Sequence, residues 1–233
     1  MVLNYPKLIS LGAMVGLTGY VLSGPVGFLM TIMLNPQPQW ESSALFVQHY
    51  NIIQDVPYYF GLLLIGGMLM LAAGQYLVAK NESDATTFHL LLSVIWTTAF
   101  AALIFFNYLT QTTFIRHLAL DYRPENDSII STFSMANPRS LSWAIEMWGY
   151  GIFGVATMLM SGYYKNRSSL IRWLLQLNGI VSILTVVLTI IDVGWVLTAG
   201  GLIGYFFWNA LMIVLMIVMI RYWRAIKITP PAS

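Results

Sequence analysis

Apolar residues in this chain run in long uninterrupted blocks. A helix needs about 20 such residues to cross the roughly 30 Å apolar core of a bilayer. Barrel strands would instead alternate in polarity over about ten residues, and the run Ala210–Ile220 shows no alternation. The pattern predicts an all-α polytopic membrane protein, a single domain over residues 1–233. Its six transmembrane helices are expected at Leu8–Leu34, Tyr58–Val78, Phe88–Thr110, Leu141–Tyr164, Trp173–Thr198 and Leu202–Ile220.

The composition supports a membrane protein and excludes several other classes. Charged residues make up 9% of the chain, against roughly 25% in soluble domains, and the mean hydropathy is +0.72. A soluble or a disordered protein is therefore excluded. The net charge of +2 leaves no basic surface for nucleic acid, so no nucleic-acid partner is expected. Cysteine is absent, which excludes disulfides and thiolate chemistry.

The basic residues orient the predicted bundle. If the N-terminus is cytoplasmic, eight basic residues fall on the cytoplasmic side and three on the outer side, as the positive-inside rule requires. Both termini are therefore expected in the cytoplasm, and the short loops suit a bacterial inner membrane. The eight are Lys7, Lys80, Lys165, Arg167, Arg172, Arg221, Arg224 and Lys227, and the three are Arg116, Arg123 and Arg139.

Small residues form a stripe on the first predicted span. They recur at intervals of three and four residues, which places them on one helix face where a neighbouring backbone can approach closely. The partner could be another span or a second copy of the chain, so a homo-oligomer through such faces is possible. Pro25, after Gly24, is expected to break this helix near its middle. The stripe consists of Gly12, Gly16, Gly19, Ser23 and Gly27.

Two carboxylates lie within the predicted spans, Glu146 and Asp192. Each would cost at least about 2.5–3.5 kcal/mol at the bilayer centre, so each requires a partner, a proton or water. At 1.5 Å per helical residue, Glu146 should lie about 7–8 Å and Asp192 about 10 Å below the outer ends of their helices. The two acids are thus expected at a similar depth on consecutive antiparallel helices.

Amides and aromatic residues gather at the same predicted level. Asn107 and Asn209 lie in the outer parts of the third and sixth spans. An interfacial aromatic belt is expected in any membrane protein, but a belt does not explain acids and amides at one depth. Aromatic rings with carboxylates suit a cation or amine, through ion pairing and cation–π contact. The expected aromatic walls of this pocket are Trp143, Tyr150, Trp195 and Trp208.

A purely structural role for the two acids is the main alternative. They could pair with Arg139, Arg116 or Arg123 near the outer rim, or form neutral hydrogen bonds between helices. Direct acid–base chemistry by the two acids is a third interpretation. Asn178, nearer the cytoplasmic side, is expected to form an interhelical hydrogen bond.

Metal and cofactor sites are not expected. His49, His89 and His117 follow no metal-ligand spacing, and no phosphate-binding glycine loop or hydrolase motif is present. In the first outer loop, residues 42–53 are expected to form an interfacial helix. Asp55, two residues before Pro57, is expected to cap the second span.

The leading functional hypothesis is therefore a membrane protein that binds or transports a small molecule or cation in an outward-facing pocket. Glu146 and Asp192 would supply the negative charge, and Asn107 and Asn209 would orient the ligand. One alternative is a membrane enzyme that uses the two acids on a lipid-borne substrate. Another is a non-catalytic sensor or assembly partner.

Overall fold

The computed structural model describes residues 4–226, and every regular element within that range is helical. The longer helices are α1 (Tyr5–Ser23), α2 (Pro25–Leu34), α4 (Val56–Asn81), α5 (Thr87–Leu109), α8 (Leu141–Ser161), α9 (Ser169–Ile191) and α10 (Ala199–Ala225). The short ones are α3 (Ser43–Gln48), α6 (Arg116–Leu120) and α7 (Asp127–Phe133). Single 3₁₀ turns cover Ile52–Asp55, Pro124–Asn126, Gly162–Tyr164 and Trp195–Leu197, and a π-helical segment covers Thr110–Ile115.

Within residues 4–226, five helical segments are long and apolar enough to cross a membrane. The prediction of six spans is not confirmed, because α8 does not reach the same apolar composition. Glu146, three glycines and several other polar side chains lower its hydropathy, and much of α8 is enclosed by its neighbours. The five segments are Tyr5–Leu34, Ile52–Asn81, Thr87–Leu120, Ser169–Ile191 and Ala199–Ala225.

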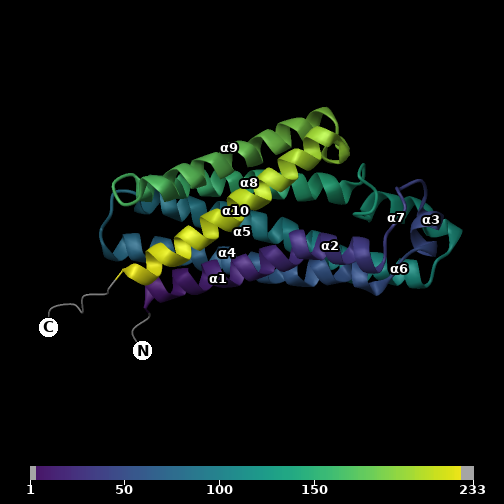
Figure 1. The fold of residues 1–233 in the computed structure, drawn as a ribbon, viewed down its shortest axis with the longest axis horizontal. Helices are drawn as coiled ribbons and strands as arrows, with labels where there is room; N and C mark the ends of the chain where they lie inside the picture. Colours follow the sequence, from purple (N-terminus) through teal and green to yellow (C-terminus); the bar gives the residue numbers. More distant parts are fainter. Residues whose placement is uncertain (1–3, 227–233) are drawn as a thin grey trace.

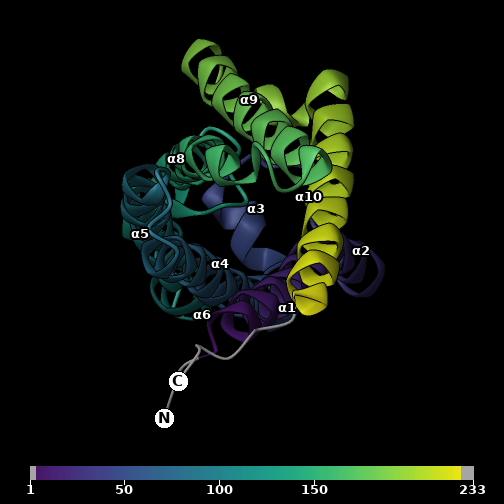
Figure 2. The ribbon, with the colours of Figure 1, turned by 90° about the vertical axis from the view of Figure 1, so that its left-hand side faces the viewer.

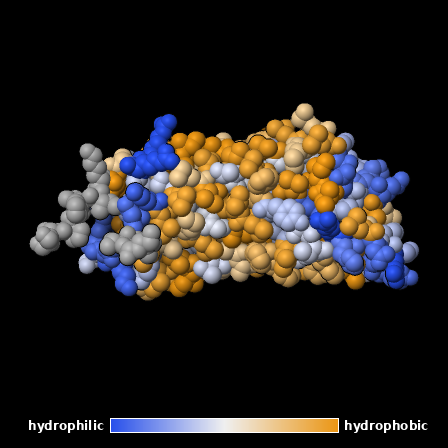
Figure 3. All heavy atoms as spheres, turned by 90° about the horizontal axis from the view of Figure 1, so that it is seen from below, coloured by the Kyte–Doolittle hydropathy of each residue, from blue (hydrophilic) through white to orange (hydrophobic). Residues whose placement is uncertain are grey.

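The long helices lie side by side and form a closed ring. In order around it, α1 packs on α4, α4 on α5, α5 on α8, α8 on α9, α9 on α10, and α10 returns to α1, as the end-on view shows (Figure 2). The start of α1 and the end of α10 lie at one end of the molecule (Figure 1). The long loops with α3, α6 and α7 lie at the opposite end, called here the loop end. A broad apolar band separates two hydrophilic ends (Figure 3), which supports membrane integration.

Glycines on α1 and α4 allow the closest helix contact in the ring. A Cβ atom added at Gly12 would lie 2.8 Å from the backbone nitrogen of Leu71. One added at Gly67 would collide with the backbone of Gly16. The prediction of close packing through the small-residue stripe is thus confirmed, and the partner is α4 of the same chain. The predicted break is also confirmed, because α1 ends at Ser23 and α2 begins at Pro25.

Two predicted boundaries are wrong near the loop end. The fifth span was expected to reach Thr198, but α9 ends at Ile191 and α10 begins at Ala199. Asp192 terminates α9, because its carboxylate accepts a hydrogen bond from the Gly194 amide at 2.9 Å. Residues 199–201, which lie between the fifth and sixth predicted spans, form the start of α10, where the Thr198 hydroxyl accepts a hydrogen bond from the Gly201 amide at 3.1 Å.

The long loops fold against one another at the loop end. The helix expected over residues 42–53 is shorter, and α3 ends at Gln48. Its Phe46 packs with Ile115, Ala119 and Ile130 in a small apolar cluster separate from the main core. The Ser43 hydroxyl donates to the Asp127 carbonyl at 2.8 Å, which ties the first loop to the second.

Charged residues fasten the loops at the other end. Arg167 donates to Glu82 at 2.7 Å and to Asp84 at 2.9 Å, so the α8–α9 link is joined to the α4–α5 link. The Thr86 hydroxyl and amide both donate to Asp84, at 2.6 and 2.7 Å. These bonds lower the pKa of the Asp84 carboxyl, and the bond from the Thr86 hydroxyl has the largest effect. Eight basic residues were expected on the cytoplasmic side, and the seven that the structure describes lie at this end. The eighth, Lys227, lies outside the described residues.

We predict opposite effects for the adjacent substitutions Gly67→Ala and Gly66→Ala. A methyl group at Gly67 meets the backbone of α1, whereas one at Gly66 meets no atom within 4 Å. Overpacking should lower the free energy of unfolding of Gly67→Ala by about 1–3 kcal/mol. Gly66→Ala should be neutral or up to about 1 kcal/mol more stable, because alanine favours a helix over glycine. Unfolding in detergent, followed by circular dichroism, measures both, and equal effects would contradict the close α1–α4 contact.

We predict a pH-dependent loss of stability for Asp84→Asn. A carboxyl with a lowered pKa stabilises the folded state while it is ionised, and loses that effect as the pH falls through its folded pKa. At pH 7 the variant should be about 1 kcal/mol less stable, given the capping bonds and one partly exposed ion pair. Below about pH 4 the difference from wild type should shrink. Unfolding measured from pH 3 to pH 8 tests this, and a constant difference would rule it out.

Candidate functional site

Glu146 is the centre of a buried hydrogen-bonded group between α8 and α5. Its side chain is 7% exposed. Asn107 Nδ2 donates to Oε2 at 2.8 Å, and the Tyr108 hydroxyl donates to Oε1 at 2.9 Å. The Tyr150 hydroxyl lies 3.4 Å from that of Tyr108 and extends the group by one residue. Adjacent residues at the end of α5 thus hold both oxygens of one carboxylate.

Every hydrogen-bond donor to Glu146 is neutral. Among residues 4–226, ion pairs within 4.0 Å involve Arg123 and Arg167, and neither pairs with Glu146 or Asp192. The expected pairing of these acids with rim arginines is therefore not found in the described part of the chain, but Glu146 does form the hydrogen bonds between helices that the same structural alternative expected. A buried carboxylate without a counter-charge is costly even when hydrogen-bonded.

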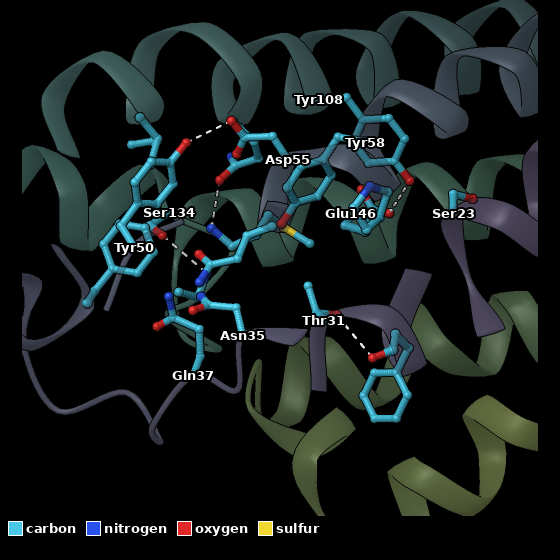
Figure 4. Close-up of a pocket in the computed structure, with 18 of the residues that line it drawn as sticks. Ser23, Thr31, Asn35, Gln37, Tyr50, Asp55, Tyr58, Tyr108, Ser134 and Glu146 are labelled. Carbon is cyan, nitrogen blue, oxygen red and sulfur yellow. Dashed lines mark hydrogen bonds between the residues drawn. The ribbon is translucent and has the colours of Figure 1, made fainter. Parts of the chain in front are cut away.

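Two cavities meet at Glu146. The first, called here the polar cavity, has a volume of about 440 Å³ and extends to the loop end, where Asn35, Gln37 and Asp55 line it. Figure 4 shows Asp55 and Glu146 among its lining residues. The second, called here the aromatic cavity, has a volume of about 340 Å³ and lies among α8, α9 and α10. The residues that line both are Ser23, Gly24, Tyr108, Met135, Trp143, Glu146 and Tyr205.

Aromatic rings form much of the wall near Glu146. Tyr150 and Trp208 make an edge-to-face contact with centroids 4.9 Å apart, and Trp208 meets Tyr20 at 5.4 Å. Tyr58 packs against Tyr108 at 5.4 Å on the side of the polar cavity. Tyr20 lines the aromatic cavity, and its hydroxyl is buried and has no hydrogen-bond partner among the described residues.

Asp55 is a second acid of the polar cavity, and the sequence patterns did not identify it as a site residue. It was expected to cap α4, and it does occupy the N-cap position, but its side chain makes no capping bond. The carboxylate instead accepts a hydrogen bond from the Tyr50 hydroxyl at 2.7 Å. Burial is the main cause that raises the pKa of the Tyr50 hydroxyl, and this hydrogen bond raises it further. Tyr50 therefore keeps its proton at neutral pH.

A loop after α7 lines the polar cavity and is fixed by side-chain hydrogen bonds. The carboxamide of Gln111 donates to the Phe133 carbonyl at 2.9 Å and accepts from the Met135 amide at 2.9 Å. The Trp143 indole donates to the Met135 carbonyl at 2.7 Å. Trp143 therefore holds this loop as well as lining both cavities.

The structure places six of the eight predicted site residues on the walls of the cavities. Asn107 is fully buried behind Glu146 and holds it, without lining either cavity. The expectation that Asp192 lies inside a span is wrong, because it is an exposed residue that ends α9. The six lining residues are Trp143, Glu146, Tyr150, Trp195, Trp208 and Asn209.

The expected interhelical bond of Asn178 is confirmed. Its amide donates to the Thr157 hydroxyl of α8 at 3.0 Å and accepts from the Trp208 indole of α10 at 2.9 Å. Asn178 thereby joins three helices and fixes the ring of Trp208. Over residues 4–226, no group of three or more histidine or acidic side chains is placed to hold a metal ion. What the site offers a ligand is a carboxylate, hydroxyls and aromatic faces.

We predict that the two candidate amides differ in their contribution to stability. Asn107 donates to a buried carboxylate, whereas Asn209 donates only to the Tyr205 carbonyl of its own helix, at 2.7 Å. Asn107→Leu should lower the free energy of unfolding by about 2–3 kcal/mol, because it removes one of the two donors to a buried carboxylate. Asn209→Leu should cost less than about 1 kcal/mol. Chemical unfolding of both variants tests this, and equal losses would contradict the assigned roles.

No family model, no curated protein and no solved structure matches this chain.

Proposed function

We propose that this chain binds a small organic cation at Glu146 and carries it across the membrane. The main support for this proposal is that Glu146 is buried, has only neutral hydrogen-bond partners and lines both cavities. A cationic ligand would supply the counter-charge that the described residues do not. Neither set of lining residues includes a lysine, arginine or histidine that would repel it.

The aromatic lining supports an amine or a quaternary ammonium ion over a metal ion. Tyrosine and tryptophan faces attract organic cations, and the attraction grows when water is excluded. Tyr108 and Trp143 line both cavities together with Glu146, and Tyr150 lines the aromatic cavity. A small metal ion would require several oxygen ligands converging on one point, whereas Glu146 and Asp55 belong to different parts of the polar cavity.

Transport, as distinct from binding alone, is supported by the interrupted first helix. Broken membrane helices frame the binding sites of many transporters, because the break frees backbone groups and permits movement. Here the break at Gly24 lies on the wall of both cavities. Asp55 and Tyr50 would attract the cation at the loop end before it reaches Glu146.

The membrane orientation belongs to the same proposal. We take α8 as the sixth span, because it packs between α5 and α9 along the ring. The basic residues near the start of α1 and the end of α10 favour a cytoplasmic location for both termini. The loop end would then face outward, in a bacterial inner membrane. A homo-oligomer stays a prediction, since the glycine face of α1 is already packed against α4.

The enzyme alternative has weaker support. It required Asp192 to act with Glu146, and Asp192 lies outside both cavities. Asp55 is a second carboxylate of the polar cavity, but its hydrogen bond to Tyr50 suits a role in attracting a cation. No observed feature specifically favours a sensor or an assembly partner.

Glu146→Gln tests cation binding. Equilibrium dialysis of purified protein in vesicles with radiolabelled tetraethylammonium measures the affinity. Loss of a buried charge partner is worth about 2–5 kcal/mol, so the variant should bind at least about thirtyfold more weakly. Asp192→Asn is the matched control, because it neutralises an exposed acid outside the cavities, and it should bind like wild type.

Two results would refute the proposal. One is saturable binding by Glu146→Gln that equals wild type, and the other is the absence of saturable binding to wild-type protein. If binding is confirmed, uptake of the same cation into vesicles, lost in Glu146→Gln and kept in Asp192→Asn, establishes transport.

A further inference from the structure

The aromatic cavity extends from Glu146 into the space between α9 and α10. On α9 its wall is formed by apolar side chains that include Val181, Leu184 and Leu188. On α10 the wall contains Gly200 and Gly204. Figure 2 shows α9 and α10 diverging toward the top of the view, and residues of both helices line the cavity. The cavity thus has a charged end and an apolar end.

The apolar end reaches the outer surface of the ring. Leu184 lines the cavity and is also 52% exposed. A Cβ atom placed on Gly204 would meet no atom within 4 Å, so open space adjoins this part of α10. The surface around the opening is apolar as well, since Ile180, Ile203 and Phe207 are exposed. In a bilayer such a surface faces the acyl chains.

We infer that the space between α9 and α10 is a lateral opening through which the ligand's hydrocarbon chain enters from the bilayer. The chain lies in the aromatic cavity, and the cationic head binds at Glu146. This inference rests on the proposed function, because Glu146 provides the binding site for the head. The substrate class is then a lipophilic cation with one alkyl chain, such as a long-chain alkylammonium.

Charge and size separate this class from ordinary phospholipids. The residues that line the two cavities include Glu146 and Asp55 but no basic side chain, so a phosphate group would be repelled. The aromatic cavity, at about 340 Å³, lies near the lower limit of the roughly 300–1,000 Å³ found for small-molecule sites. That volume favours one chain over two.

The absence of cysteine makes a reversible test possible. The sequence contains no cysteine, so Gly204→Cys introduces a single thiol at the opening. Benzyl methanethiosulfonate attaches a bulky apolar group to that thiol, and dithiothreitol removes it. Gly66→Cys is the matched control, because an added Cβ there also meets open space, on a helix that does not line the aromatic cavity. Binding of dodecyltrimethylammonium and of tetraethylammonium is measured in vesicles by equilibrium dialysis.

The expected result is selective and reversible. Modification of the Gly204→Cys protein should weaken dodecyltrimethylammonium binding at least tenfold, and reduction should restore it. Tetraethylammonium has no long chain and can enter through the polar cavity, so its binding should stay unchanged. The Gly66→Cys protein should bind both cations normally before and after modification.

Failure of the inference is distinguishable from failure of the proposed function. The lateral opening is refuted if modification leaves dodecyltrimethylammonium binding intact, or weakens both cations equally, while Glu146→Gln still abolishes tetraethylammonium binding. If Glu146→Gln binds both cations as well as wild type does, the cation site itself is refuted, and the lateral opening falls with it.

Discussion

A carboxylate held inside a helical bundle by neutral donors is the constraint on which the site depends. Glu146 is buried on α8, and its donors come from the next helix in the ring. Asn107 and Tyr108 supply them from consecutive positions of α5, and this pairing fixes how the two helices align. Around that alignment the two cavities form, with their boundary at the carboxylate. The polar network therefore determines both where the ligand's charge would bind and how α5 and α8 pack.

Much of the fold could be predicted from the sequence, because long apolar blocks leave a membrane helix few alternatives. The broken first helix, the glycine contact and the three-helix bond of Asn178 follow from proline geometry, residue size and the cost of a buried amide. Glu146 and the aromatic residues near it were also identifiable, since a lone acid in an apolar block is rare. The span count was harder to predict, because α8 carries the site and is correspondingly less apolar.

The rest of the site depends on contacts that spacing along one helix does not reveal. Asp192 resembled Glu146 in depth, but a turn stabilised by its own carboxylate ends α9 at that point and leaves it exposed. Asp55 resembled a helix cap, and only the fold of the first loop brings Tyr50 to its side chain. In the sequence, Tyr108 and Tyr20 look like ordinary aromatic residues of apolar helices. Asn107 and Asn209 looked equivalent, yet one faces a carboxylate and the other a cavity.

The glycine contact between α1 and α4 has a mechanical consequence for the whole ring. Where two backbones touch directly, no side chain lies between them that could change rotamer and let the helices slide. The α1–α4 pair is therefore a stiff part of the ring. Packing is looser where α9 meets α10, because these two helices border a cavity partly lined by glycine. A change in the volume of a bound molecule would be absorbed at that contact, while α1 and α4 keep their spacing.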